Sequence, residues 1–187
     1  MALTHSKDIL IGAIAPGFTL QGVDGKKHTL EEISKGKRAT VIMFICNHCP
    51  YVKAYFDRLI TLAHHYQTKG AAFVGINAND EINYPDDSFK NMVTLAKQKE
   101  FPFLYLRDHD QKIAKAYDAV CTPEIYVADE KNVIQYHGGI DDSWDDESKV
   151  KKQYLKNAIE DILVHRKVHE PTPHAMGCSI KWTTSTY

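Results

Sequence analysis

The sequence lacks the features that mark several classes of protein. Its net charge is −1, from 23 Lys and Arg against 24 Asp and Glu, so no general attraction to nucleic acid or to an anionic membrane is expected. No apolar run approaches the ~18 residues of a membrane-spanning helix. Four cysteines in 187 residues are too few for a disulfide-stapled fold. Repeats and low-complexity tracts are absent as well, which leaves an ordinary globular chain.

One short apolar run, ILIGAIA at residues 9–15, imitates a signal peptide because it follows Lys7 and ends in small residues. Gly12 interrupts the run and Asp8 cancels the charge of Lys7, which both count against that interpretation. We therefore expect a cytoplasmic, reducing location. There a CxxC pair is more often catalytic or metal-binding than structural.

Apolar runs typical of buried strands alternate with segments of helical periodicity. This order predicts one α/β domain over residues 1–187, with residues 167–187 as an irregular tail packed on it. Strands are expected at 39–45, 71–78 and 103–106, and hairpins at 18–30 and 124–138. Helices are expected at 31–35, 50–69, 88–99, 110–117 and 148–165, with a polar loop at 79–87. This order implies a mixed sheet covered by helices, in which the central strands are parallel and the final hairpin is antiparallel.

The stretch CNHCPYV carries the clearest chemical signal. Cys46 and Cys49 follow a predicted strand and open a helix, the place where α/β proteins put their sites. Unpaired N–H groups and the dipole of a helix N-terminus lower the pKa of a thiol there. The three-residue spacing puts both sulfurs on one side of the first turn, close enough for a disulfide. His48 can add a positive charge or a hydrogen bond.

The position of Pro50 leaves one alternative open. Proline prefers the first position of a helix. If Pro50 takes that position, Cys49 is the N-cap and the more activated sulfur. If the helix begins at Cys46, Pro50 removes a hydrogen bond from the first turn. The answer affects which cysteine attacks.

In a second motif, CTPEIYV, Thr122 and Pro123 come just before a predicted strand. A proline at this place predicts a tight connection with a cis peptide bond, which would lie against the dithiol. Cys121 would then also lie near the dithiol, as a packed thiol, a third redox thiol or a metal ligand. Cys178, in the tail, is expected to pack, with pairing to another cysteine as the alternative.

Together these residues resemble the thioredoxin-like superfamily, and most closely its redoxin branch, often labelled AhpC/TSA-like. APGFTL (15–20), VIMFICNHC (41–49) and TPEIYVADEKNVIQYHGG (122–139) are similar to the redoxin opening, the active-site strand and the cis-proline hairpin. GCSIKW (177–182) is similar to the closing motif of a poorly characterised subgroup. The resemblance covers nearly the whole chain. It implies a thioredoxin-like fold: a central mixed β-sheet flanked by helices, with an N-terminal hairpin extension and an irregular C-terminal tail.

The resemblance also implies roles. Cys46 would be the attacking thiol, Cys49 the resolving thiol, and Pro123 the cis-proline that shields the pair and guides the substrate backbone. The CNHC sequence resembles the motif of strong disulfide oxidases, so an oxidising pair is expected. Substrates would be protein or small-molecule thiols and disulfides, and electrons would pass to or from a cellular dithiol reductant without a cofactor. The substrate groove is expected to include Asn47, Thr122 and Cys121.

Two departures from the family patterns stand out. Thr40 occupies the position where thioredoxins carry a buried carboxylate that accepts a proton. Peroxiredoxins carry PxxxTxxC, but counting back from Cys49 places Cys46 and Ile42 at the Thr and Pro positions, and counting back from Cys46 places Met43 and Ala39 there. The arginine position falls near Pro123. A peroxidase needs such groups to polarise the O–O bond.

We therefore predict a thiol–disulfide oxidoreductase that uses the Cys46–Cys49 dithiol with His48. A peroxiredoxin-like enzyme that reduces hydroperoxides is one alternative. A module that binds zinc or copper through Cys46, Cys49 and Cys121 is another, because soft thiolates suit these metals. The main prediction includes no metal. A scaffold with inert thiols is the fourth interpretation.

Overall fold

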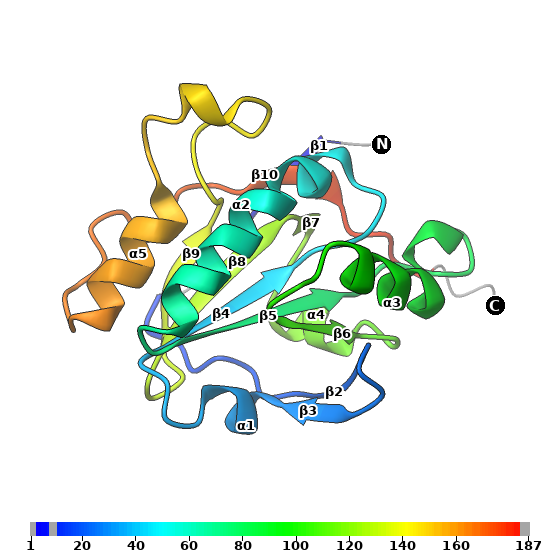
Figure 1. The fold of residues 1–187 in the computed structure, drawn as a ribbon, viewed down its shortest axis with the longest axis horizontal. Helices are drawn as coiled ribbons and strands as arrows, with labels where there is room; N and C mark the ends of the chain where they lie inside the picture. The colour runs from blue at the N-terminus through cyan, green and yellow to red at the C-terminus, as the bar shows by residue number, and fades with distance from the viewer. Residues whose placement is uncertain (1–2, 8–10, 184–187) are drawn as a thin grey trace.

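The structure is a computed structural model, and it describes residues 3–7 and 11–183 (Figure 1). Two residues of the signal-like run, 9 and 10, and the last four residues of the predicted tail lie outside the described part. No helix within the described ranges is both long and apolar enough to cross a membrane.

A seven-stranded mixed sheet forms the centre of the molecule, with the strand order β3-β2-β6-β5-β4-β8-β9. Strands β4, β5 and β6 are parallel, whereas β8 and β9 form an antiparallel hairpin that joins β4. The predicted mixed sheet and both hairpins are confirmed. The bounds are β2 Thr19–Gly22, β3 Lys27–Thr29, β4 Ala39–Phe44, β5 Ala71–Asn77, β6 Leu104–Arg107, β8 Glu124–Asp129 and β9 Ile134–Gly138.

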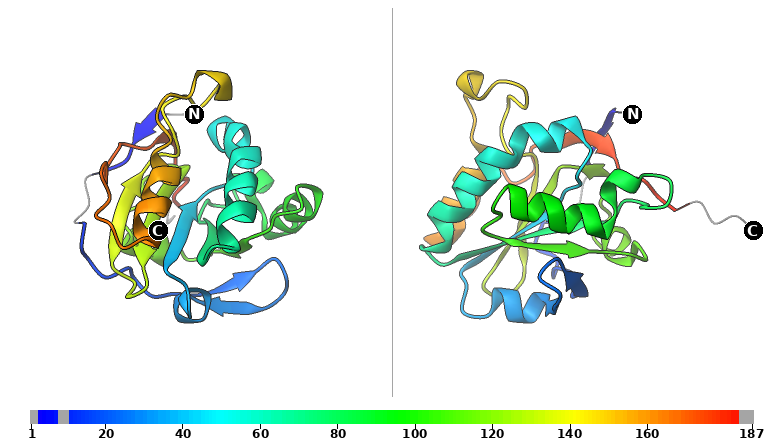
Figure 2. Two further views of the ribbon diagram at one scale, coloured as in Figure 1. Left: turned by 60° about the vertical axis from the view of Figure 1, so that its left-hand side comes forward. Right: turned by 45° about the vertical axis from the view of Figure 1, so that its right-hand side comes forward.

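Helices cover both faces of this sheet (Figures 1 and 2). All six residues of β4 are buried, and they alternate between two cores. Val41 and Met43 pack toward the core that contains α2, α3 and α5, while Ile42 and Phe44 pack toward the core that contains α4. A strand that is apolar on both faces belongs in the middle of such a sandwich. The helices are α1 Leu30–Ser34, α2 Pro50–Gln67, α3 Phe89–Gln98, α4 Lys112–Ala116 and α5 Tyr154–Leu163.

The prediction of a helix over 148–165 is wrong in its first part. A short 3₁₀ turn at Glu147–Lys149 is followed by extended chain, and α5 begins at Tyr154. The backbone N–H groups of Lys151 and Lys152 donate to the Asp142 carboxylate, at 2.9 and 3.0 Å. These bonds hold the segment in a loop because the same N–H groups are then not available to a helix.

The prediction of an irregular tail is also wrong in part. Strand β10, Met176–Ser179, lies between β1, Leu3–His5, and β7, Cys121–Thr122, in a second sheet with the order β1-β10-β7. Both pairings are antiparallel. The closing segment of the chain is therefore tied to the connection that precedes Pro123, a contact that local periodicity does not reveal.

Candidate active site

The turn from β4 into α2 carries both cysteines of the CxxC motif. Helix α2 begins at Pro50, and Cys49 is its N-cap with extended backbone angles (φ −64°, ψ 124°). The missing N–H of Pro50 costs nothing at the first helical position. Of the two alternatives that the sequence left open, the structure has the one in which Cys49 stands at the positive end of the helix dipole.

Thr122 forms the opposite wall of the site. Its peptide bond to Pro123 is cis. The Thr122 hydroxyl lies 3.2 Å from Cys46 Sγ, and the Cys49 thiol donates to the Thr122 carbonyl oxygen at 3.2 Å. Both cysteines are fully buried, at 1% and 0% exposure. A substrate therefore reaches the sulfurs only when a neighbouring segment moves.

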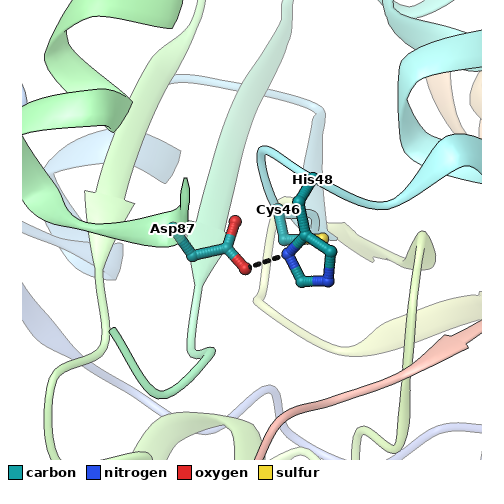
Figure 3. A group of neighbouring side chains, drawn as sticks. All are labelled: Cys46, His48 and Asp87. Atoms are coloured by element: carbon teal, nitrogen blue, oxygen red, sulfur yellow. Dashed lines mark hydrogen bonds and ion pairs between the residues drawn. The ribbon is translucent and has the colours of Figure 1, made fainter. Parts of the chain in front are cut away.

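His48 contacts the carboxylate of Asp87, which comes from a loop distant in the sequence. Its Nδ1 is 2.5 Å from Asp87 Oδ2, with the Cys46 sulfur close to the ring (Figure 3). The hydrogen bond with Asp87 raises the pKa of His48, so the ring gains a positive charge more readily than an isolated imidazole. His48 Nε2 is buried and has no hydrogen-bond partner among the described residues. The hydrogen-bonding capacity of that atom is therefore not used by the described residues.

Asp87 is held as an anion by several donors. The backbone N–H of Asn47 donates to Oδ1 at 2.6 Å, and the Asn79 side chain donates to Oδ2 at 2.7 Å. Burial raises the pKa of Asp87, but hydrogen bonds from His48, Asn79 and Asn47 outweigh it and leave the pKa below its usual value. The Tyr105 hydroxyl in turn donates to Asn47 Oδ1 at 2.9 Å. The His48 ring is thus fixed by a network and not by one contact.

The two active-site thiols are driven toward opposite protonation states. A hydrogen bond from Cys46 lowers the pKa of Cys49 to about 5 despite burial, and Cys178 and the Val52 backbone N–H lower it further. Burial raises the pKa of Cys46 well above its usual value, and the adjacent Cys49 and Asp87 raise it more. These shifts make Cys49 the more easily ionised of the two thiols.

The closing GCSIKW segment contributes to the same corner. Cys178 contacts Cys49 through its thiol and its backbone. The Lys181 backbone N–H donates to Asn79 Oδ1 at 2.8 Å, and the Lys181 ammonium lies 5.7 Å from the centre of the Tyr84 ring. Tyr84 stacks on His48 with ring centres 5.7 Å apart. The tail therefore supports both the dithiol and the imidazole.

Several of the residues singled out in the sequence come together here, and others do not. Cys46, Cys49, His48, Asn47 and Thr122 share one corner, with Pro123 next to Thr122. Cys121 is fully buried, and its thiol donates to Glu124 Oε2 at 3.5 Å. Thr40 is buried with no partner for its hydroxyl among the described residues, so it supplies no proton acceptor.

The structure supplies a different set of potential metal ligands from the expected one. Among the described residues, Cys46, His48 and Asp87 offer ligand atoms within 4.8 Å of one another, and neither Cys49 nor Cys121 belongs to this group. A thiolate, an imidazole and a carboxylate suit zinc. The Asp87 oxygens already accept from Asn47, Asn79 and His48, so a metal would have to displace at least one of these donors.

Sequence reasoning missed Asp87 and the role of the tail. A usable signal existed for Asp87. It lies in the polar loop after β5, the strand next to β4, and loops at the carboxyl ends of adjacent parallel strands face the same site. For β10 the sequence offers only the GCSIKW resemblance, because its partners are far apart in the chain.

Comparison with known proteins places the chain in a family. The family model described as AhpC/TSA family matches residues 11–137. No curated protein matches the chain. An uncharacterized conserved protein from Geobacillus kaustophilus is 43% identical over 100% of this chain and 99% of its own, with a TM-score of 0.94. A hypothetical protein from Sinorhizobium meliloti is 33% identical over 97% and 100%, with a TM-score of 0.92.

A more distant structure relates the fold to thioredoxins. The thioredoxin domain of a thiol-disulfide oxidoreductase from Bacteroides vulgatus is 16% identical, with a TM-score of 0.65 over 83% of this chain and 99% of that one. At this identity the likeness concerns the fold alone. The predicted thioredoxin-like fold and the likeness to the redoxin branch are confirmed.

Proposed function

The chain belongs to the AhpC/TSA family, and we propose that it is a thiol–disulfide oxidoreductase in which Cys49 is the reactive thiolate and Cys46 the resolving thiol. The observation that carries this proposal is the position of Cys49 as N-cap of α2, with Pro50 at the first helical position. The proposal reverses the roles that the resemblance implied. It rests on the same two sulfurs.

The reaction requires two exchanges. The Cys49 thiolate attacks one sulfur of a substrate disulfide, forms a mixed disulfide and releases one substrate thiolate. Cys46 then attacks the Cys49 sulfur, which closes the Cys46–Cys49 disulfide and releases the second substrate thiolate. The substrate is reduced by two electrons, and the protein dithiol is oxidised by two. The reverse sequence oxidises a dithiol substrate.

His48 supplies the proton transfers. As an imidazolium it donates its Nε2 proton to the first leaving thiolate, and the neutral ring then accepts the proton that Cys46 loses. The unpartnered Nε2 and the ion pair with Asp87 support this role. The dyad would thus replace the buried carboxylate that Thr40 does not provide. Pro123, beside Thr122, is assigned the substrate-backbone contact.

The low pKa of Cys49 affects the redox potential of the dithiol more than it affects the rate at which Cys49 attacks a disulfide. A fall from 9.0 to about 5 raises the thiolate fraction at pH 7 by ~100-fold, but intrinsic nucleophilicity falls by ~60-fold over the same range. The two effects nearly cancel. The reduced form, however, is stabilised by about 3 kcal/mol at pH 7, or ~60 mV in potential. The lowered pKa of Cys49 therefore makes the pair more oxidising than the same pair with an unperturbed thiol.

Metal binding is the second candidate, favoured by the cluster of Cys46, His48 and Asp87. Protein purified without chelator would then carry zinc or copper in stoichiometric amount. Hydroperoxide reduction is subsidiary. An accessible low-pKa thiolate reacts with peroxide to some degree, but the sequence lacks the peroxiredoxin motif around Cys49.

The test is a disulfide map of reduced, metal-free protein treated with oxidised glutathione and quenched with an alkylating agent. Wild type should form a Cys46–Cys49 disulfide, and Cys49→Ser should form no disulfide or glutathione adduct at Cys46. The proposal fails if all thiols of the wild type stay alkylatable. It also fails if Cys46 becomes glutathionylated in Cys49→Ser as fast as Cys49 reacts in wild type.

A further inference from the structure

Strand β10 brings a third sulfur to the dithiol. Within the small sheet, Cys178 is the backbone partner of Thr122. Thr122 is also the residue whose hydroxyl and carbonyl contact Cys46 and Cys49, each at 3.2 Å. Two cysteines from the turn before α2 and one from β10 therefore surround one residue.

Cys178 makes a direct contact with the reactive sulfur. Its thiol and its backbone N–H both hydrogen-bond to Cys49. The views of the fold agree, because β10, drawn in red-orange, passes the N-terminal end of α2 (Figures 1 and 2). Cys178 is 2% exposed and belongs to the same buried cluster as Cys46 and Cys49.

The neighbouring residue keeps β10 in close contact with this wall. A Cβ on Gly177 would stand 2.1 Å from the Thr122 carbonyl oxygen, so only glycine allows the two strands to approach as they do. The close approach of the β10 backbone to Thr122 thus fixes the position of Cys178 beside Cys49.

Cys121 shows what a packed thiol looks like in the same region. It is also fully buried, but its sulfur lies against Glu124 Oε2 and the Pro123 carbonyl oxygen. A carboxylate in contact with a thiol opposes thiolate formation, and hence attack on a disulfide. Cys121 is therefore the matched control for Cys178.

We propose that Cys178 is a second resolving thiol, which attacks a mixed disulfide on Cys49 and closes a Cys49–Cys178 disulfide that fastens β10 to the start of α2. This inference rests on the proposed function, because it needs a mixed disulfide on Cys49. With oxidised glutathione, the first exchange gives Cys49–S–S–glutathione and one glutathione thiolate. Cys178 then attacks the Cys49 sulfur, and its proton leaves with the second glutathione. The protein loses two electrons and oxidised glutathione gains two.

The disulfide would have a structural consequence. The dithiol is buried, and β10 lies on the wall beside it. A Cys49–Cys178 bond would hold the strand in place. Attack by Cys46 on Cys49 would release it again, with the bond transferred to Cys46–Cys49 and no net change in oxidation.

The experiment uses Cys46→Ser, which removes the first resolving thiol. Reduced protein is mixed with oxidised glutathione, and glutathione release and peptide disulfides are followed by rapid quenching and mass spectrometry. We expect a Cys49–Cys178 disulfide in Cys46→Ser and in Cys46→Ser/Cys121→Ser. In Cys46→Ser/Cys178→Ser the glutathione adduct on Cys49 should persist, with release at least tenfold slower. Circular dichroism and thermal melting establish that each variant is folded.

The outcomes separate the two proposals. A glutathione adduct that persists on Cys49 in Cys46→Ser, as long-lived as in the double variant, overturns the role of Cys178 and leaves Cys49 as the reactive thiolate. Loss of the intramolecular disulfide in the Cys121 double variant would assign the role to Cys121. If Cys49 takes up no glutathione in any folded variant, the proposed function itself fails.

Discussion

Two regions of this protein each combine a cysteine, a histidine and a carboxylate, but they differ in how easily the cysteine ionises. In the first, Cys46 and Cys49 lie beside the His48–Asp87 pair, whose closest atoms are 2.5 Å apart. In the second, Cys121 lies beside the His137–Glu124 pair, at 2.7 Å. A cysteine next to a histidine–carboxylate pair is therefore not in itself a reactive site.

The arrangement of the groups explains the difference. In the first region no carboxylate contacts the sulfur at the N-terminus of α2, whose neighbours are the donors Cys46, Cys178 and the Val52 N–H and one acceptor, the Thr122 carbonyl oxygen. The imidazole, not the Asp87 carboxylate, offers an unpartnered atom among the described residues. In the second region the Glu124 carboxylate contacts the thiol itself, and burial together with that charge raises the pKa of Cys121. One corner lowers the pKa of a thiol, and the other raises it.

The second region has a structural explanation instead. Glu124 is fully buried and accepts hydrogen bonds from four residues on both sides of the cis connection. These donors are the backbone N–H groups of Val120 and Cys121, the Tyr126 hydroxyl and His137 Nε2. The cluster therefore fixes β7 and the start of β8, and with them the Thr122 wall of the dithiol.

The largest effect is expected from removal of that carboxylate. Glu124→Ala leaves His137 and two backbone N–H groups buried without their acceptor, so the free energy of unfolding should fall by about 3–5 kcal/mol. Urea unfolding followed by circular dichroism measures the change. Glu130→Ala, in the exposed hairpin turn, is the control and should stay within about 0.5 kcal/mol of wild type. A loss of under about 1 kcal/mol in Glu124→Ala would contradict the structural role.

The sequence reveals the first region better than the second. The apolar run at 41–45, the turn CNHCP and the Thr122–Pro123 pair are local signals, and they predict the strand, the helix and the corner in which the sulfurs meet. Asp87 and Glu124 each act through contacts that local patterns do not encode. Asp87 lies 40 residues from Asn47, and Glu124 lies 13 residues from His137. Polar residues that fold back onto a distant element leave no periodicity in the chain.

An effect that is smaller for each pH unit, and of opposite sign in the two regions, is expected in the pH dependence of stability. The pKa of Cys49 is lowered from 9.0 to about 5, so its contribution is complete above pH 9 and disappears as pH falls toward 5. Between these limits the free energy of unfolding should rise with pH by about 1.4 kcal/mol per unit relative to Cys49→Ser. The pKa of Cys121 is raised, so its contribution is present below pH 9 and declines above it.

Urea titrations of wild type, Cys49→Ser and Cys121→Ser at several pH values measure these contributions. His48 has a raised pKa, and its contribution is present below pH 6.5 and is lost as pH rises through the folded-state value. That trend opposes the one from Cys49, so only the difference between wild type and Cys49→Ser isolates the thiolate. An equal pH slope in wild type and Cys49→Ser would show that Cys49 is not ionised in the folded protein.

The smallest effect tests whether the first region works through its imidazole. In Asp87→Asn the His48 pKa should fall toward 6.5, because the hydrogen bond with a charged partner is its largest cause. At pH 7.5 fewer molecules then carry the imidazolium that protonates the leaving thiolate, and exchange with oxidised glutathione should slow by about tenfold. At pH 5.5 the ring is protonated with or without Asp87, so most of the loss should disappear. Stopped-flow rates across this range give the profile.

Asp80→Asn is the matched control for that experiment, because Asp80 lies in the same loop and bonds to Asn83 and the Ile82 N–H instead of to His48. Its exchange rate should follow that of wild type at every pH. A loss in Asp87→Asn that is the same at pH 5.5 and 7.5 would mean that the carboxylate only shapes the loop. The first region would then resemble the second, with a buried carboxylate that acts on structure, and the reactivity of Cys49 would come from the helix N-terminus and its neighbouring thiols alone.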